Sequence, residues 1–312
     1  MEHRKIVKIG GSYYVSLPKK WVDIHNLKDS SIVAVEARRG VLEIYPISMK
    51  TRTETAEIVA DDFLLQRLVT AYLDGAEIVD IHFKDDLNPE LIDKLEKTLR
   101  LLVGAEIVEE SRNRIVIQCF LREDYDISSL IYRVDRITGS MYVDAVKAVL
   151  KEDEELAQSV ISRDDKVDKL FFLIVRLIRS SLKKAGLKSG EILKLLDYRL
   201  AVRNLERIGD YSEAIAKFSL RVSTPTPEFF KQLSASTRRI AELQHGVVKS
   251  FINRNIYESS KYEKILGNLY DELNNLRNNA LKKRLPPITY LTVDRVIRIV
   301  EELEDIAGLT SG

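Results

Sequence analysis

The chain has 312 residues, of which 45% are hydrophobic, and its 49 basic and 48 acidic side chains nearly cancel. This length predicts two to four domains. Because the overall charge is balanced, any surface that binds nucleic acid must come from a local excess of basic residues. The single cysteine excludes a disulfide framework or a cysteine-rich zinc site. Because neither a signal segment nor a long uncharged apolar run is evident, we expect a cytoplasmic protein without membrane insertion.

Residues 4–47 predict a small, mostly β unit. Its strand-like runs are Lys5–Ile9, Tyr13–Leu17, Ser31–Glu36 and Val41–Tyr45, with turns at 10–11 and 39–40. Pro18 starts a short helical segment over Lys19–Ile24, at a position where proline is tolerated. A unit of this size buries little apolar surface by itself, so we expect it to dimerise and to interleave two chains in one core.

Charge in this first segment is locally asymmetric. Up to position 50 there are nine basic residues against five acidic ones. Lysine and arginine that neutralise phosphates supply most sequence-independent affinity for DNA. The candidates for contacting DNA are therefore Arg4, Lys5, Lys8, Lys19 and Lys20, with ordinary solvated side chains as the alternative.

The run from Gly11 to Trp21 resembles the AbrB/MazE (SpoVT-AbrB) swapped-hairpin DNA-binding fold, in particular its archaeal branch. The resemblance covers roughly residues 3–47 and implies a dimer that binds DNA. Val22 and Asp23 stand where the bacterial pattern has paired arginines, so the residues that read bases cannot be carried over.

Residues 53–121 alternate between strand and helix patterns. We predict strands at 56–60 and 77–83, helices at 62–74 and 89–103, and a final hairpin of 106–109 with 114–121. Asn88 followed by Pro89 is a helix start. The result is a small α/β domain, with a ferredoxin-like arrangement as one candidate, that serves as a spacer or dimerisation module. Cys119 lies in the last strand, where we expect an inert buried thiol.

From Tyr125 onward apolar residues recur at intervals of three and four, which predicts helices throughout. Breaks fall near 151–153, at 186–190 and in the proline-containing linker 223–227. The segment after this linker repeats the plan, with helices at 228–254, 258–284 and about 289–309. The predicted domains are thus 1–50, 51–123 and two all-α three-helix bundles, 124–222 and 223–312.

Pairs of carboxylates four residues apart recur on the helices. They are Asp164 with Asp168, Glu206 with Asp210, and Glu301 with Asp305. Residues at this spacing share one helix face, where like charges repel unless a cation, a basic side chain or solvent separates them. Gly209 stands within one of these helices at a cost of about 1 kcal/mol relative to Ala, which indicates close packing or ligand access. The pattern predicts a metal site, with solvated acidic faces as the alternative.

The nine residues Arg203–Tyr211 closely resemble the signature of the PhoU family of phosphate-uptake regulators. This resemblance implies paired three-helix bundles that carry multinuclear metal clusters on Glu/Asp-x-x-x-Asp motifs, in agreement with the two predicted bundles. All-oxygen ligation suits Mg, Mn or Fe ions, and Zn remains an option. The alternative is that Arg203 and Arg207 neutralise the acids as helix salt bridges.

The second bundle departs from this pattern. Glu301 and Asp305 are kept, but the partner helix offers Glu263 followed by Gly267, with Asp271 elsewhere. The second metal cluster has therefore either been lost or uses Glu263. Glu302 and Glu304 crowd the same helix, which an exposed acidic face would explain.

These features together predict a dimeric, DNA-binding transcriptional regulator linked to phosphate homeostasis, whose bundles act as a sensor or docking module. The alternative is an adaptor that does not bind DNA, docks on a phosphate transporter or sensor kinase, and uses its N-terminal unit to dimerise. An antitoxin-like protein is disfavoured because such proteins keep a disordered tail. An enzyme is not expected, because no nucleophile–base spacing surrounds the four histidines, His3, His25, His82 and His245.

Overall fold

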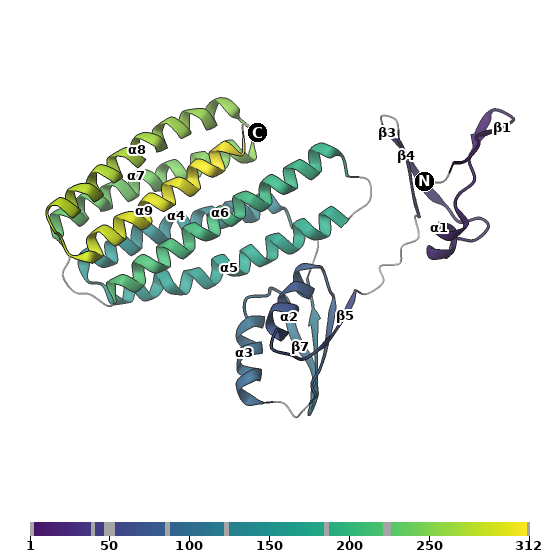
Figure 1. Ribbon diagram of the computed structural model, residues 1–312, viewed down its shortest axis with the longest axis horizontal. Helices are drawn as coiled ribbons and strands as arrows, with labels where there is room; N and C mark the ends of the chain where they lie inside the picture. The colour runs from purple at the N-terminus through teal and green to yellow at the C-terminus, as the bar shows by residue number, and fades with distance from the viewer. Residues whose placement is uncertain are drawn as a thin grey trace. The chain divides into compact units, whose positions relative to one another are not determined.

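The computed structural model describes residues 3–38, 41–46, 54–84, 88–121, 125–183, 187–220 and 226–310 (Figure 1). Contacts divide the chain after Arg52 into two compact units, each of which is described by itself. The predicted turn at 39–40 and parts of the breaks at 186–190 and 223–227 lie outside the described residues. Within the described ranges, no helix is both long and apolar enough to cross a membrane.

The first unit consists of two antiparallel hairpins and one short helix. Its elements are β1 (Val7–Ile9), β2 (Ser12–Tyr14), α1 (Lys19–Ile24), β3 (Val33–Arg38) and β4 (Val41–Pro46). β1 pairs only with β2, and β3 only with β4. The predicted strands and helix are confirmed. Every described side chain of this unit is exposed or half-buried, so the hairpins form no closed core within one chain.

The second unit begins with an α/β domain. It contains β5 (Thr55–Val59), α2 (Leu64–Leu73), β6 (Ile78–His82), α3 (Pro89–Leu99), β7 (Ala105–Ser111) and β8 (Arg114–Cys119). β5 and β6 are parallel, β8 lies antiparallel to both β6 and β7, and the strand order is β5-β6-β8-β7. The apolar faces of α2 and α3 and the sheet residues Val79, Ile81, Ile115 and Ile117 form the core of this domain.

The α/β domain is confirmed, but a ferredoxin-like arrangement is wrong. That arrangement follows the order β-α-β-β-α-β, whereas this chain runs β-α-β-α-β-β. The short turn between Ser111 and Arg114 joins β7 directly to β8, so the two strands form a terminal hairpin instead of straddling a second helix.

Six long helices complete the second unit. They are α4 (Ile127–Lys151), α5 (Glu154–Lys183), α6 (Ser189–Ser219), α7 (Pro227–Ile252), α8 (Ile256–Lys282) and α9 (Pro287–Gly308). The two predicted three-helix sets pack side by side through α4 against α7 and α6 against α9 (Figure 1). Their buried residues form one continuous hydrophobic core, so the sets are halves of one helical body. Glu152, in the left-handed conformation, ends α4 where the sequence predicts a break.

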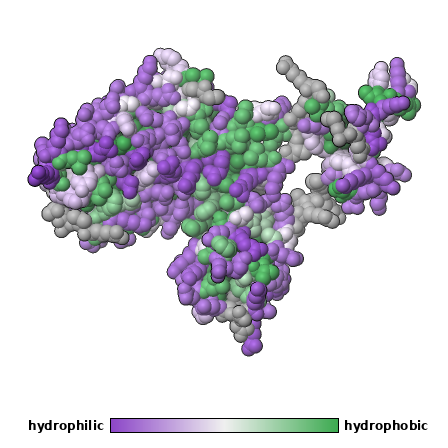
Figure 2. Space-filling model, in the orientation of Figure 1, coloured by the Kyte–Doolittle hydropathy of each residue, from purple (hydrophilic) through white to green (hydrophobic). Residues whose placement is uncertain are grey.

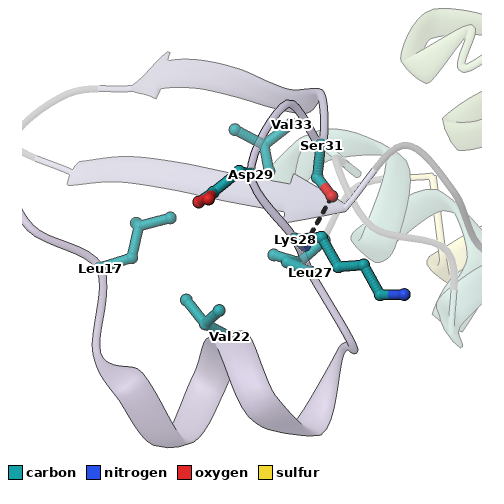
Figure 3. A pocket seen from close by; sticks show the side chains of 7 residues that line it. All are labelled: Leu17, Val22, Leu27, Lys28, Asp29, Ser31 and Val33. Atoms are coloured by element: carbon teal, nitrogen blue, oxygen red, sulfur yellow. Dashed lines mark hydrogen bonds between the residues drawn. The ribbon is translucent and has the colours of Figure 1, made fainter.

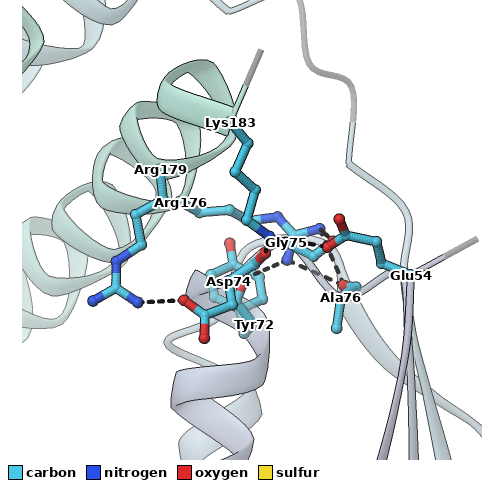
Figure 4. A network of polar contacts seen from close by, with 8 residues as sticks. All are labelled: Glu54, Tyr72, Asp74, Gly75, Ala76, Arg176, Arg179 and Lys183. Carbon is cyan, nitrogen blue, oxygen red and sulfur yellow. Dashed lines mark hydrogen bonds and ion pairs between the residues drawn. The ribbon is translucent and has the colours of Figure 1, made fainter. Parts of the chain in front are cut away.

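A buried arginine joins the α/β domain to the helical body (Figure 4). Arg176 of α5 is 7% exposed, and its guanidinium donates to the carbonyl oxygens of Tyr72, Gly75 and Ala76 at the end of α2. The Tyr72 carbonyl also accepts from the backbone N–H of Gly75 at 3.0 Å, and Gly75 and Ala76 directly follow α2. A cation at a helix C-terminus meets the unpaired carbonyls and the negative end of the helix dipole. Arg179 pairs with Asp74 nearby, at 2.6 Å. These contacts hold α2 in place along α5.

On the face shown in Figure 2, the surface of the helical body is largely hydrophilic, and a large apolar area lies over the N-terminal half of α6. The exposed apolar side chains there are Ile192, Leu193, Leu196 and Leu200, which are 38%, 56%, 46% and 51% exposed. They recur at intervals of three and four along the helix, so they share one of its faces.

Candidate functional site

The four carboxylates predicted in the first bundle come together between α5 and α6. Asp164 and Asp168 lie on α5, and Glu206 and Asp210 lie on α6. The two helices pack directly against each other, and burial, followed by the negative charges of Asp168 on α5 and of Glu213 and Asp210 on α6, raises the pKa of Asp164. Spacing along each helix therefore placed the acids correctly on facing stripes.

Gly209 is what allows the two acidic faces to approach. A Cβ atom at this position would lie 2.9 Å from Asp164 Oδ1 and 3.3 Å from a methyl carbon of Val167. Any larger residue would push α5 and α6 apart or displace the carboxylate. The close-packing explanation for this glycine therefore holds, and it brings Asp164 against the backbone of α6.

Loss of solvent and mutual repulsion shift the pKa values of all four carboxyl groups upward. Burial, followed by repulsion from Asp168, raises the pKa of Asp164 to about 8. The pKa of Asp168 rises to about 6 and that of Glu206 to about 7, in both cases through burial first and Asp210 second. Burial also raises the pKa of Asp210, while Arg203 opposes the shift. The cluster therefore binds positive charge, as protons or as a cation, more readily than solvated carboxylates do.

The two arginines of the motif have different partners. Arg203 donates from Nη1 to both carboxylate oxygens of Glu206 at 2.9 Å, as the salt-bridge alternative predicts. Arg207 instead pairs with Glu302 of α9 at 3.1 Å and donates to the hydroxyl of Tyr211 at 2.9 Å. Only one arginine thus neutralises the cluster by direct contact, and the other links α6 to the second bundle.

Three observations bear on whether this cluster fits a cation. Asp164 Oδ1 is buried and has no hydrogen-bond partner among the described residues, and an unpaired buried carboxylate oxygen is costly. The all-oxygen donor set is the type that hard cations take. The side chains as they stand, however, do not close into a metal-ligating group of three or more within the described part of the chain. The donors are of the right kind, and a cation would require them to turn toward one point.

The pair predicted in the second bundle lies on the surface of α9. Glu301 pairs with Arg298 at 2.8 Å, and Asp305 is exposed. The residue that gathers negative charge is Glu304. Its pKa is raised by burial and then by Glu301, Asp305, Glu263 and Asp271. Glu263 and Asp271 thus both face this region from α8, and Gly267 lies beside it, because a Cβ there would be 3.8 Å from Glu304 Oε1.

The expectation of an exposed acidic face is wrong for Glu302. This residue is 4% exposed, and its Oε2 has no hydrogen-bond partner among the described residues. It follows Ile299 by three positions and precedes Ile306 by four, so it falls on the apolar stripe that faces the core. That periodicity was the available signal, although the sequence could not show that Arg207 of another helix would pair with it.

All five predicted DNA-contacting residues lie on the surface of the first unit. Arg4, Lys5 and Lys8 are on or before β1, Lys19 and Lys20 begin α1, and each is exposed. Lys8 lies over the ring of Tyr13, with 5.8 Å between Nζ and the ring centre. Within the described ranges, Lys5, Lys8, Lys19 and Lys20 take part in no ion pair, so their charges are available to phosphates.

The same unit contains an open cavity of about 460 Å³, which is lined by four aliphatic residues and by Lys28, Asp29 and Ser31 (Figure 3). Leu17, Val22, Leu27 and Val33 turn into it from α1 and the neighbouring strand and loops, while Lys28 points away. Four aliphatic side chains face this cavity in a unit none of whose described side chains is buried, so they belong to an unfinished core, since protein interiors are normally close-packed.

Comparison with known proteins finds two domain models that each match part of the chain. The model of the PhoU domain matches residues 131–219, and the model described as antidote-toxin recognition MazE, bacterial antitoxin, matches residues 6–52. A phosphate-specific transport system accessory protein PhoU homolog of Clostridium acetobutylicum is 22% identical over 191 residues, which cover 60% of this chain and 86% of that protein. The crystal structure of PhoU from Pseudomonas aeruginosa aligns with a TM-score of 0.53 at 19% identity, over 60% of this chain and 95% of that one, which shows a common fold.

Proposed function

We propose that this chain, which carries a PhoU domain behind a MazE-like N-terminal domain, is a dimeric DNA-binding regulator of phosphate uptake and has no enzymatic activity of its own. The observation that carries the proposal is the first unit, where exposed unpaired lysines surround a fold that no single chain completes. The link to phosphate rests on the relative, which is named for the phosphate-specific transport system.

Dimerisation is the physical completion of the first unit. Two separate hairpins without a buried residue do not hold together in water, because two-stranded sheets by themselves are marginal. A second copy would cover the exposed apolar residues of the unit and fill the cavity at Leu17, Val22, Leu27 and Val33. Pairing two copies also doubles the number of lysines available to one DNA duplex.

The first test measures binding of the full chain to genomic DNA fragments across a salt series. We expect affinity to fall steeply with salt, because lysines that contact phosphates release counterions. The triple variant Lys5→Gln, Lys19→Gln, Lys20→Gln should bind more weakly and with a shallower salt slope. A matched triple variant, Lys147→Gln, Lys151→Gln, Lys264→Gln, removes the same charge from exposed positions of the helical body and should bind like the wild type. Equal losses in both triple variants, or no binding by the wild type, would refute DNA binding by the first unit.

The acidic cluster is our candidate for the sensor. When bound, a cation would supply the positive charge that lets Asp164, Asp168, Glu206 and Asp210 ionise together, and Mg, Mn, Fe and Zn are the candidates. Asp164, with its unpaired oxygen, and the two α6 acids would hold it. Arg207 lies one residue from Glu206 and contacts Glu302, so a change at the cluster reaches α9 through one ion pair. We propose that this contact relays the state of the cluster to the packing of the two bundles and so to the DNA-binding units.

A second candidate is an adaptor that docks on a phosphate transporter component or sensor kinase. The exposed apolar face of α6, at Ile192, Leu193, Leu196 and Leu200, supports it, because contiguous apolar surface often marks a protein-binding site. The two candidates differ in the first unit. If the adaptor alone is correct, the lysine triple variant regulates phosphate uptake like the wild type, whereas Leu193→Gln with Leu196→Gln abolishes regulation.

A further inference from the structure

A basic groove lies between the α/β domain and the helical body. It is formed on the side of α5 that meets α4, whereas the acidic cluster lies on the side of α5 that meets α6. It has a volume of about 480 Å³ and is lined by residues of α4, α5 and the segment after α3. The lining residues are Val103, Arg133, Arg136, Ile137, Lys166, Lys169 and Leu170. Four are cationic and three are aliphatic, and none is acidic.

The cations form two facing pairs. Arg133 and Arg136 are three residues apart on α4, and Lys166 and Lys169 are three apart on α5, so each pair shares one helix face. The two helices pack side by side, which brings the pairs to the same groove. Their mutual repulsion opposes this arrangement unless negative charge separates them.

No described residue forms an ion pair with the four cations, and the charge of Asp135, which neighbours Arg136 in the chain, acts on Arg136 without direct contact. Throughout the ranges that the structure describes, none of the four cations forms an ion pair or a side-chain hydrogen bond. By contrast, Arg163, Arg176 and Arg179, which also lie on α5, each contact a carboxylate or carbonyl oxygen at 3.1 Å or less. The protein thus leaves four converging cations unpaired at one groove while it pairs their neighbours.

The shape and lining of the groove narrow the chemistry of a ligand. Arginine side chains bind phosphates through parallel hydrogen bonds, and lysine supplies compact positive charge. The aliphatic side chains of Val103, Ile137 and Leu170, called the floor here, would gain nothing from an inorganic phosphate, whereas the flat face of a nucleotide base packs favourably on apolar side chains. The volume falls in the range of small-molecule sites, about 300–1,000 Å³.

We propose that this groove binds a nucleoside polyphosphate, with its phosphates between the Arg133–Arg136 and Lys166–Lys169 pairs and its base on the aliphatic floor. The site touches both the α/β domain, through Val103, and the PhoU domain, through α4 and α5. A nucleotide there would hold these two parts together. This inference is independent of whether the first unit binds DNA.

Titration calorimetry on the full chain tests the proposal at low salt, with EDTA present so that no metal bridges the nucleotide to the acidic cluster. The probes are ATP, adenosine and inorganic tripolyphosphate. We expect ATP to bind, tripolyphosphate to bind at least about tenfold more weakly, and adenosine not to bind, because charged hydrogen bonds supply most of the affinity and the floor supplies the remainder.

Variants locate the site. Arg136→Gln with Lys169→Gln should weaken ATP binding about tenfold or more. Lys147→Gln with Lys151→Gln removes equal charge from exposed, unpaired positions of the same layer, on α4 beyond the groove, and should change ATP affinity less than twofold. Val103→Thr preserves side-chain shape while it adds a hydroxyl to the floor, so it should weaken ATP more than tripolyphosphate.

Three results would overturn the proposal. The first is no ATP binding at millimolar concentration. The second is equal affinity for ATP and tripolyphosphate, which would leave the apolar floor without a role. The third is unchanged ATP affinity in the Arg136 and Lys169 double variant while its circular dichroism matches the wild type, which would place any nucleotide elsewhere.

Discussion

Replacement of Asp164 by asparagine should remove a pH-dependent loss of stability. The pKa of Asp164 is raised from 3.8 to about 8, so the folded protein holds this proton more tightly than the unfolded chain does. The stabilisation from protonated Asp164 is therefore complete below about pH 4 and declines as the pH rises to about 8. Asparagine resembles the protonated carboxyl and cannot ionise, so the variant lacks this decline.

The magnitude follows from the shift. At about 1.36 kcal/mol for each pH unit, a rise from 3.8 to about 8 corresponds to at most about 5–6 kcal/mol. Because part of the side chain contacts solvent, which screens the charge, we expect less than half of this, about 2 kcal/mol. The variant should match the wild type near pH 3.5, below the ordinary pKa of 3.8, and exceed its melting temperature by about 4–8 °C at pH 8.5.

The assay is thermal unfolding followed by circular dichroism at 222 nm in EDTA, at both pH values. Asp165→Asn is the matched control, because Asp165 is the exposed neighbour on the same helix and its replacement should change stability by less than about 0.5 kcal/mol. Wild type and Asp164→Asn melting temperatures that vary in parallel with pH would refute the reasoning. Addition of Mg²⁺ or Mn²⁺ at pH 8.5 should stabilise the wild type and not the variant, since a cation binds the ionised cluster.

Three further changes test the packing around the site, all by the same unfolding assay. Gly209→Ala should lower the free energy of unfolding by about 1–3 kcal/mol, because its Cβ would lie 2.9 Å from Asp164 Oδ1. Gly190→Ala, which lies in open space on the same helix, should be neutral or stabilising. Equal effects of the two changes would contradict the close-approach argument. Arg176→Ala should cost about 2–4 kcal/mol and raise hydrogen exchange at the end of α2, because buried carbonyls lose their donors. Gln244→Leu should cost about 1–3 kcal/mol, because its amide bridges α7 to α4 through several buried hydrogen bonds; an unchanged melting temperature would show that solvent replaces them.

Local pattern was enough to predict most of the secondary structure and the meeting of four carboxylates between α5 and α6. Helices and strands were placed because periods of 3.6 and 2 are properties of neighbouring residues. The same geometry put Glu206 and Asp210 on one face of α6, and Gly209 beside them already indicated a close approach. The parallel pairing of β5 with β6 was not predicted, because strand order depends on contacts between distant segments.

Pairing between helices was decided only by the tertiary structure. The sequence by itself determined that α9 carries an acidic run, but the register of α6 against α9 decides that Glu302 is buried and that Arg207 turns to it rather than to Asp210. Likewise, Arg136 and Lys169 are ordinary surface residues of their own helices, and only the packing of α4 against α5 brings them to one groove. The physical reason is that helix geometry determines which residues share a face, whereas the partner that each face meets depends on how distant segments pack into a common core.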